Sequence, residues 1–174
     1  MNSQRFWEVV QNAHDQSNGD MERKCEVIEA VVSSLSKRDA IAFSRSFDLM
    51  MDRAYSWMLW GAAEVIFNGP CSDDTFFDFR ASLISRGRQV YESALSDPDS
   101  MADENFAKED WFYEGYQYAV KNGVENAVGF LPIRHKSFPS EPSGYRCIAD
   151  EIYDLFPRLA EKVGAYLREA AVTR

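Results

Sequence analysis

The stretch MERKCEVIEAVVSSL, residues 21–35, shows most clearly how this chain folds. Its apolar residues recur at steps of four, three, four and three, which is the spacing of one face of an α-helix. These residues are Met21, Cys25, Ile28, Val32 and Leu35. Because such a stripe has to be covered by other elements, the segment predicts a core-facing helix in a helical domain.

Similar stripes run through most of the sequence. They predict helices at about residues 3–17, 43–66, 72–95, 111–123 and 148–170. The helix over residues 43–66 is expected to stop at Asn68-Gly69-Pro70. Gly87 is expected to end or kink the helix over residues 72–95, and Pro157 to kink the last helix or to begin a new one. No alternating strand pattern of any length is present. The predicted fold class is therefore all-α.

A long loop interrupts these helices near the C-terminal end. Residues 124–145 contain Pro132, Pro139, Pro142 and Gly144, which leave no room for a regular helix. We expect this segment to wrap over the surface and to expose basic residues within 133–138. A chain of 174 residues is most simply one compact multi-helix domain. We expect residues 1–125 to form its helical body and residues 126–174, the loop and C-terminal helices, to pack on it.

The charge balance limits the kinds of partner. The chain has 19 Lys and Arg against 28 Asp and Glu, which gives a net charge of −9. Residues 1–130 carry −10 of this charge and residues 131–174 carry +1. An acidic surface argues against nucleic acid and against anionic membranes as partners, because both attract excess Lys and Arg. The charge suits a basic protein partner.

The cysteines and the hydropathy pattern bear on the compartment. Cys25, Cys71 and Cys147 are odd in number, widely spaced and without a CxxC pair, so neither a disulfide framework nor a cysteine metal site is predicted. Cys25 lies on an apolar stripe and is expected to be a small buried hydrophobe. No segment approaches the ~20 apolar residues of a membrane span, and no signal-peptide run follows the N-terminus. We expect a cytoplasmic protein.

The central segment resembles a bacterial family known as domain of unknown function 4240. The matching runs are 6–7 (FW), 52–57 (DRAYSW), 59–63 (LWGAA), 71–74 (CSDD), 76 (F), 79–80 (FR), 83–85 (LIS), 87–88 (GR), 90–91 (VY) and 97–100 (DPDS). The resemblance covers roughly residues 3–125. In the family, Gly-Gly-Cys-Ser occupies the turn that reads Asn68-Gly69-Pro70-Cys71 here, a change that stiffens it. The resemblance implies a helical fold and a bacterial cytoplasmic setting, and it implies no activity or catalytic residue.

The densest polar cluster begins the helix at residue 72. Asp74 and Asp78 are four residues apart and share a helix face, so they could hold a metal ion or a proton between them. The simpler interpretation is that Ser72 caps the helix while Asp73 and Asp74 stabilise its first turn. Arg80, Arg86 and Arg88 follow in the same region. They could clamp a phosphate or carboxylate, but ion pairing within the molecule is favoured.

Trp57 and Trp60, with Tyr55 nearby, form the third candidate cluster. The two tryptophans are three residues apart on one helix face and precede the small residues Gly61, Ala62 and Ala63. Large rings beside small residues predict close helix packing in which the rings fill gaps in the core. If a ring is exposed instead, it becomes a natural contact point for a partner protein.

No nucleophile elbow, P-loop or dinucleotide-binding motif occurs, and neither His14 nor His135 lies beside a partner that would orient it as a base. We therefore expect no catalytic residue, no metal ion and no cofactor. The sequence favours a non-enzymatic, acidic protein-binding domain, of which a bacterial immunity or antitoxin-like inhibitor is the most concrete example. The alternative is a small enzyme or a sensor of an anionic ligand that uses the Asp and Arg cluster of residues 72–88.

Overall fold

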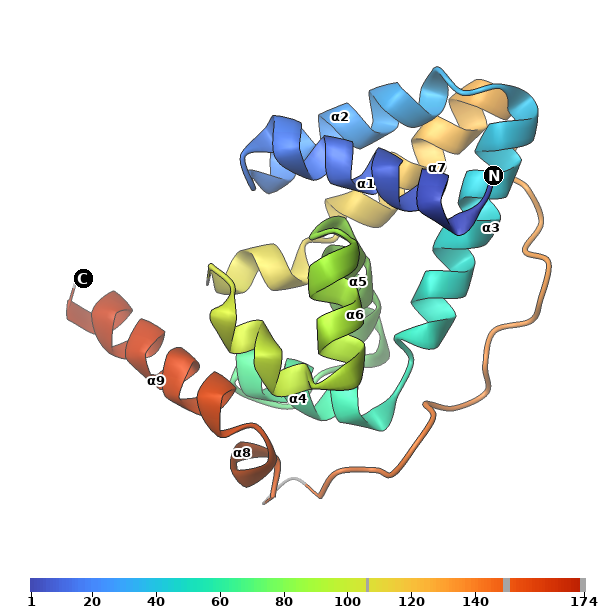
Figure 1. Ribbon diagram of the computed structural model, residues 1–174. Helices are drawn as coiled ribbons and strands as arrows, with labels where there is room; N and C mark the ends of the chain where they lie inside the picture. Colours follow the sequence, from blue (N-terminus) through green and yellow to red (C-terminus); the bar gives the residue numbers. More distant parts are fainter. Residues whose placement is uncertain (106, 149–150, 173–174) are drawn as a thin grey trace.

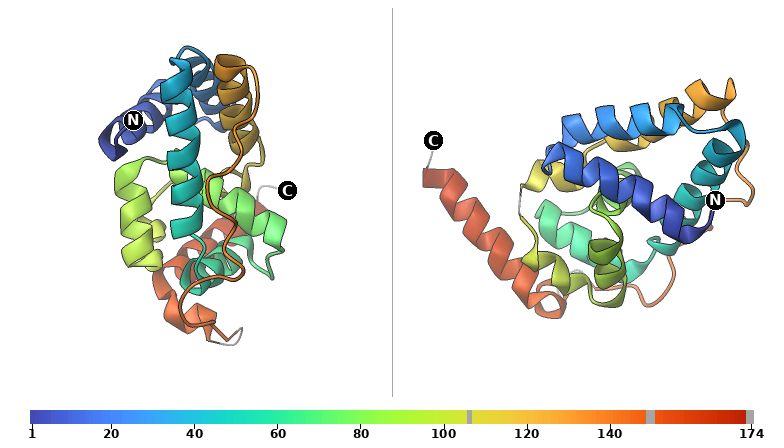
Figure 2. Two further views of the ribbon diagram at one scale, coloured as in Figure 1. Left: turned by 90° about the vertical axis from the view of Figure 1, so that its right-hand side faces the viewer. Right: turned by 45° about the horizontal axis from the view of Figure 1, so that its top comes forward.

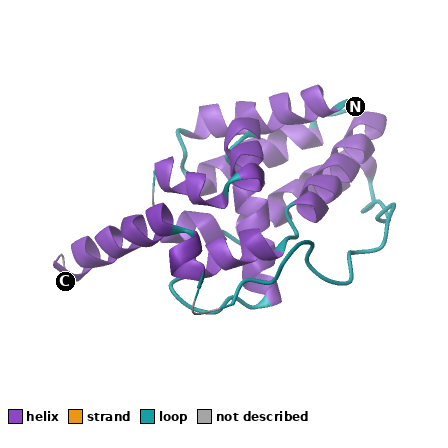
Figure 3. Ribbon diagram, turned by 60° about the horizontal axis from the view of Figure 1, so that its bottom comes forward, coloured by secondary structure: helices purple, strands orange, loops and turns teal. Residues whose placement is uncertain are grey.

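The structure is a computed structural model that describes residues 1–105, 107–148 and 151–172, apart from the side chains of residues 108 and 172. The predicted all-α class is confirmed, because the described residues form helices and loops and contain no strand (Figure 3). The α-helices are α1 Ser3–Ser17, α2 Met21–Ser33, α3 Lys37–Arg53, α4 Trp57–Phe67, α5 Asp73–Ser85, α6 Arg88–Ser96, α7 Gly115–Val128, α8 Ile152–Leu155 and α9 Pro157–Val172. Two short 3₁₀ helices are η1 Pro98–Asp103 and η2 Lys108–Phe112.

Helices α1, α2 and α7 lie side by side at one end of the molecule (Figures 1 and 2). The predicted end of α7 at residues 121–123 is wrong, since the helix continues to Val128 and ends at Gly129, where φ is 92°. Gly123 is needed for packing instead. A Cβ atom there would lie 2.9 Å from Cβ of Val32 and 3.0 Å from the carbonyl oxygen of Glu29. Glycine therefore allows α7 to pack directly against the backbone of α2.

The predicted helix over residues 43–66 is also wrong, because a turn at residues 54–56 divides it into α3 and α4. The hydroxyl of Ser56 caps α4 by accepting a hydrogen bond from the amide of Leu59 at 3.3 Å. A distant residue holds the same turn. The amide of Ser143 donates to the carbonyl of Tyr55, and the amide of Trp57 donates to the carbonyl of Ser143, both at 2.9 Å. The apolar stripe continues across the turn, so the sequence pattern alone did not indicate it.

The boundary between α5 and α6 agrees with the prediction. Ser72 caps α5 by accepting from the amide of Thr75 at 3.1 Å. Gly87 separates the two helices with a φ of 92°, a conformation that favours glycine. A Cβ atom at this position would also lie 2.3 Å from Oε1 of Gln11. The backbone angle therefore requires glycine here, whereas the Gln11 amide is the end of a flexible, exposed side chain that can move aside.

One hydrophobic core connects most of the helices. It includes Phe6 and Val10 of α1, Ile28 of α2, Phe43 of α3, Phe76 and Phe79 of α5, Tyr116 of α7, Phe156, and Leu159 and Val163 of α9. Helix α9 begins at Pro157, as the sequence indicated. Asp99 of η1 accepts hydrogen bonds from the amides of Arg158 at 3.1 Å and Leu159 at 2.9 Å. This cap fixes the start of α9, whose far end extends away from the body (Figure 2).

Residues 129–148, which we call the strap, connect α7 to the C-terminal helices without regular structure. The strap runs alongside α3 towards the start of α4 (Figures 1 and 2). Arg134 fastens it there: its Nε lies 3.7 Å from Oδ1 of Asp48, and its guanidinium also pairs with Asp52. Although the segment was expected to present basic groups to a partner, the charge of Arg134 is thus neutralised within the molecule. None of the described helices is both long and apolar enough to cross a membrane.

Candidate binding site

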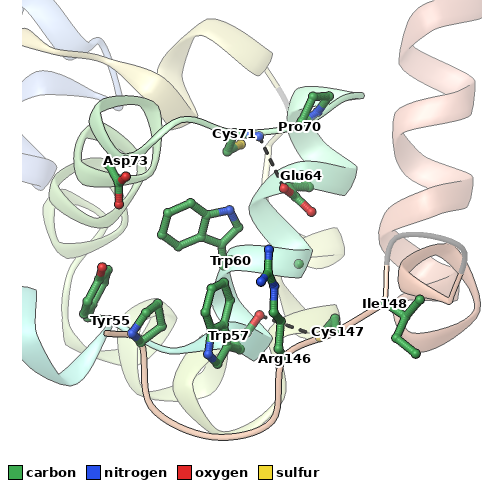
Figure 4. A pocket seen from close by; sticks show the side chains of 12 residues that line it. Tyr55, Trp57, Trp60, Glu64, Pro70, Cys71, Asp73, Arg146, Cys147 and Ile148 are labelled. Atoms are coloured by element: carbon green, nitrogen blue, oxygen red, sulfur yellow. Dashed lines mark hydrogen bonds between the residues drawn. The ribbon is translucent and has the colours of Figure 1, made fainter. Parts of the chain in front are cut away.

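A pocket with a volume of about 660 Å³ lies beside α4, and we call it the tryptophan pocket (Figure 4). Its walls come from two stretches that are far apart in the sequence, residues 55–73 and residues 142–148. The α3–α4 turn and α4 supply Tyr55, Trp57, Trp60, Gly61 and Glu64; the turn into α5 and the first residue of α5 supply Pro70, Cys71 and Asp73; the strap supplies Pro142, Arg146, Cys147 and Ile148. The pocket therefore exists only because the strap returns to the start of α4.

Three aromatic rings line one side of the pocket. The ring centres of Trp57 and Trp60 are 5.5 Å apart, and those of Tyr55 and Trp60 are 6.3 Å apart. Trp60 rests on the buried ring of Phe76, at 4.5 Å between centres. Both tryptophans are half-buried. The prediction that they fill gaps inside the core is therefore wrong in part: Trp60 packs against the core, but neither ring is enclosed by it.

The small residues after the tryptophans make room for the C-terminal segment rather than for the rings. A Cβ atom at Gly61 would lie 3.2 Å from Sγ of Cys147 and 3.2 Å from Cε2 of Phe156. Ala62 and Ala63 are fully buried. Because this face of α4 is occupied by the strap and by Phe156, the tryptophan rings are left at the pocket wall.

Three charged side chains line the pocket. Glu64 accepts a hydrogen bond from the amide of Cys71 at 3.4 Å, which ties α4 to the turn before α5. Asp73 lies in the first turn of α5 and is exposed. The guanidinium carbon of Arg146 lies 4.8 Å from the ring centre of Trp57, and within the described parts of the chain no carboxylate forms an ion pair with it. The charged lining is thus two carboxylates and one guanidinium.

The pocket also contains two thiols, and all three cysteines, each in a described part of the chain, are without a disulfide. Cys147 donates from Sγ to the carbonyl of Trp57 at 3.6 Å, and burial raises the pKa of its thiol. Burial likewise raises the pKa of Cys25, outside the pocket, to about 11. A thiol with a raised pKa is less ionised at neutral pH, which makes Cys147 a weaker nucleophile than an ordinary cysteine.

Arg80 lies behind the pocket rather than in it. It is buried, its Nη1 donates to the carbonyl of Met51 at 2.8 Å, and its guanidinium carbon lies 4.6 Å from the ring centre of Tyr55. Burial lowers its pKa to about 10, so it still carries its charge at neutral pH. Arg80 thus supports the α3–α4 turn and the ring of Tyr55.

The other two arginines of the predicted cluster lie at different places. Arg86 is buried with its guanidinium carbon 3.7 Å from the ring centre of Trp111, and its Nη1 is 4.0 Å from Oε2 of Glu104. Arg88 is exposed and donates to Oε1 of Gln4 at 3.4 Å. The structure therefore does not bring Arg80, Arg86 and Arg88 together as a clamp for one anion.

The acidic residues of α5 are divided in the same way. Asp73 faces the tryptophan pocket, whereas Asp74 and Asp78 border a separate hollow beside α7. Oδ1 of Asp78 accepts from Nε2 of Gln117 at 2.8 Å, and burial raises the pKa of its carboxyl group. Among the described residues, no three His, Cys, Asp or Glu side chains are placed to hold a metal ion.

Trp57, Trp60 and Asp73 were predicted from the sequence as candidate binding residues, whereas the contributions of Glu64 and Arg146 to the same pocket were not. Glu64 has the spacing of a helix neighbour of Trp60, which is a weak signal. Arg146 has no local signal, because its position depends on where the strap lies. Only the proline-rich composition of residues 124–145 indicated that a long segment would cross the body.

A family described as "Protein of unknown function (DUF4240)" matches residues 1–126. The chain belongs to this family. Neither the curated proteins nor the solved structures contain a significant match to it. The part matched by the DUF4240 family includes α4, α5 and all the aromatic rings of the pocket. The strap residues that complete the pocket come after the matched part.

Proposed function

We propose that this protein is a non-enzymatic, acidic protein-binding domain, and that the tryptophan pocket is the point at which a basic partner docks. The observation that carries the proposal is the composition of the pocket: half-buried tryptophan rings beside Glu64 and Asp73. Tryptophans with one face buried and one face accessible are frequent contact points in protein interfaces. The two carboxylates beside them favour a positively charged partner group.

The charge of the whole chain supports the same kind of partner. The net charge of −9 would attract a basic protein over several ångströms and raise its association rate. A role in binding also needs no reactive group, which agrees with the raised pKa of the Cys147 thiol. The alternative is an enzyme or anion sensor built on residues 72–88. It has no single site, because Arg80, Arg86 and Arg88 lie at different places.

Within this class we favour an immunity or antitoxin-like inhibitor acting in the bacterial cytoplasm. An inhibitor of this kind needs a stable domain and a surface complementary to one basic protein. The family resemblance suggests the bacterial setting, and the three thiols agree with a reducing compartment.

The test is capture of a partner by the immobilised protein from a lysate of the organism that encodes it, at about 50 mM and about 500 mM salt. We expect one basic protein to be retained in stoichiometric amount at low salt and released at high salt. The variant Trp57→Ala should lose it. The matched control is Tyr118→Ala, which removes an exposed ring on α7 that does not line the pocket and whose centre lies 5.2 Å from Nζ of Lys121.

Two results would count against the proposal. One is the absence of any stoichiometric partner at low salt. The other is equal retention by wild type and Trp57→Ala, which would place the interface elsewhere. Circular dichroism of both variants shows whether a loss of binding is a loss of folding.

A further inference from the structure

The strongest clue to what the tryptophan pocket binds is the group already in it. Arg146 comes from the strap, is exposed, and has its guanidinium carbon 4.8 Å from the ring centre of Trp57. Figure 4 shows its side chain extending along Trp57 on the side of the pocket where Trp60 and Glu64 lie. A guanidinium over a tryptophan face is a cation–π contact, which needs no direct ion pair.

We infer that the tryptophan pocket is a receptor for an arginine side chain of the partner protein, and that Arg146 occupies this receptor in the unbound protein. The inference rests on the proposed function and adds the chemistry of the group recognised. Arg146 then acts as an internal competitor, which an incoming arginine replaces on Trp57.

The lining favours a guanidinium over other occupants. A planar cation can stack on Trp57 while its N–H groups point towards carboxylates, and Glu64 and Asp73 line the same pocket. These two carboxylates would repel an anion in the pocket. Arg146 is the single cation among the pocket's lining residues, all of which the structure describes. An ammonium group can also lie over tryptophan, but it lacks the flat face that stacks on the ring.

The position of Arg146 on the strap makes replacement possible without unfolding. Ser143 is fixed to the α3–α4 turn by two backbone hydrogen bonds of 2.9 Å, and Cys147 lies against Trp57 and Gly61. The backbone on both sides of Arg146 is therefore anchored, while its side chain is exposed. A rotation of this side chain is enough to open the face of Trp57.

Such a competitor has a measurable consequence. An exposed cation–π contact is weak, so its removal should strengthen binding of an external guanidinium by about two- to fivefold. The gain should appear in Arg146→Ala and not in the matched control Arg88→Ala, which also removes an exposed arginine. Arg88 has its own neighbour, Gln4, and does not line the pocket.

The experiment titrates the full chain with N-acetyl-arginine amide and, separately, with N-acetyl-citrulline amide, which has the same shape without the charge. The readout is the indole N–H signals in a ¹⁵N-correlated NMR spectrum. Trp57 and Trp60 line the pocket, whereas Trp7 and Trp111 are buried and serve as internal references. We expect the arginine amide, and not the citrulline amide, to shift the signals of Trp57 and Trp60 in a saturable way.

Three outcomes would overturn the inference: equal binding of the citrulline amide, no saturable shift with the arginine amide in either wild type or Arg146→Ala, or weaker binding in Arg146→Ala. The last result would mean that Arg146 holds the ligand. A titration with inorganic phosphate then identifies an anion site. The proposed function has a separate test, because loss of the captured protein in Trp57→Ala would support it even if the arginine amide failed to bind.

Discussion

Two arginine–tryptophan pairs in this molecule have the same chemistry and opposite surroundings. Arg86 lies 3.7 Å from the ring centre of Trp111, and both side chains are buried. Arg146 lies 4.8 Å from the ring centre of Trp57, and the arginine is exposed. The first pair cannot separate without opening the core, whereas the second can separate by rotation of one side chain. Burial, rather than the contact itself, decides which pair is structural and which is exchangeable.

The surroundings of the buried pair show what such burial requires. Within the described residues, Arg86 forms an ion pair with Glu104, whose Oε2 lies 4.0 Å from Nη1 of Arg86. Lys24 is a second buried cation close to Arg86. Its Nζ donates a hydrogen bond to Oγ of Ser85, the residue before Arg86, at 3.4 Å. Placing two cations in a core is costly unless they are well paired. The packing around Lys24 and Arg86 therefore has to offset the cost of burying their charges, a cost that the exposed Arg146 does not have.

The largest expected difference between the two pairs is in stability. Trp111→Ala should lower the free energy of unfolding by about 3–5 kcal/mol, because it removes a large, fully buried ring. Trp57→Ala should lower it by no more than about 1 kcal/mol, since that ring is half-buried at a pocket wall. Denaturant unfolding of both variants measures the difference. Equal losses would show that Trp57 belongs to the core and that the contrast is wrong.

The stability of the protein should also depend on pH through the buried Lys24. Burial, with a smaller effect of Arg86, lowers the pKa of Lys24 from its usual 10.5 to about 8. Between these two values the unfolded chain binds more protons than the folded one, so stability rises with pH in this range. The gain from pH 8 to pH 10 should be about 2 kcal/mol.

The control for this prediction is Lys24→Met, which fills similar space without the charge. Its stability should not show the rise, so the difference between wild type and variant isolates the contribution of Lys24 from that of every other titratable group. Parallel pH profiles of the two proteins would mean that Lys24 is not desolvated.

The same contrast explains which parts of the fold followed from the sequence. Ser72, Gly87 and Pro157 set helix boundaries through their own backbone and capping chemistry, and these boundaries were predicted. The turn at residues 54–56 and the continuation of α7 past Gly123 were not. They depend on Ser143 and on the α2 backbone, which are distant in the sequence.

The candidate site divides along the same line. Trp57 and Trp60 are three residues apart on one helix face, so their association was visible in the sequence, whereas Asp73 was predicted as part of a separate acidic cluster. Arg146 reaches the pocket only because long-range contacts position the strap, among them the pairing of Arg134 with Asp48 and Asp52. No pattern in residues 129–148 encodes these contacts. Arg80, for which the sequence left an anion clamp open and favoured ion pairing within the molecule, lies buried behind Tyr55 and donates to a backbone carbonyl.

Trp60 lies between the two extremes and tests how sharply the pocket is separated from the core. One face of its ring packs on the buried Phe76 at 4.5 Å between ring centres. Trp60→Ala should therefore cost about 1–2 kcal/mol of stability, less than Trp111→Ala and more than Trp57→Ala. Thermal or denaturant unfolding of the three variants gives their order. A loss as large as that of Trp111→Ala would place Trp60 in the core after all.

The smallest expected effect is on ligand binding and concerns Glu64, a carboxylate that lines the pocket with Arg146. Glu64→Gln keeps an oxygen that can accept the hydrogen bond from the amide of Cys71, so the turn before α5 should hold. It removes one negative charge from the pocket wall, which should weaken binding of N-acetyl-arginine amide by about two- to fivefold at low salt and less at high salt.

The matched control is Glu125→Gln on α7, which changes the net charge by the same amount without lining the pocket. If both variants weakened binding equally, the overall charge of the protein would account for the attraction, and Glu64 would have no specific part in recognising the guanidinium. A loss confined to Glu64→Gln locates the recognition in the pocket, beside the ring that Arg146 occupies.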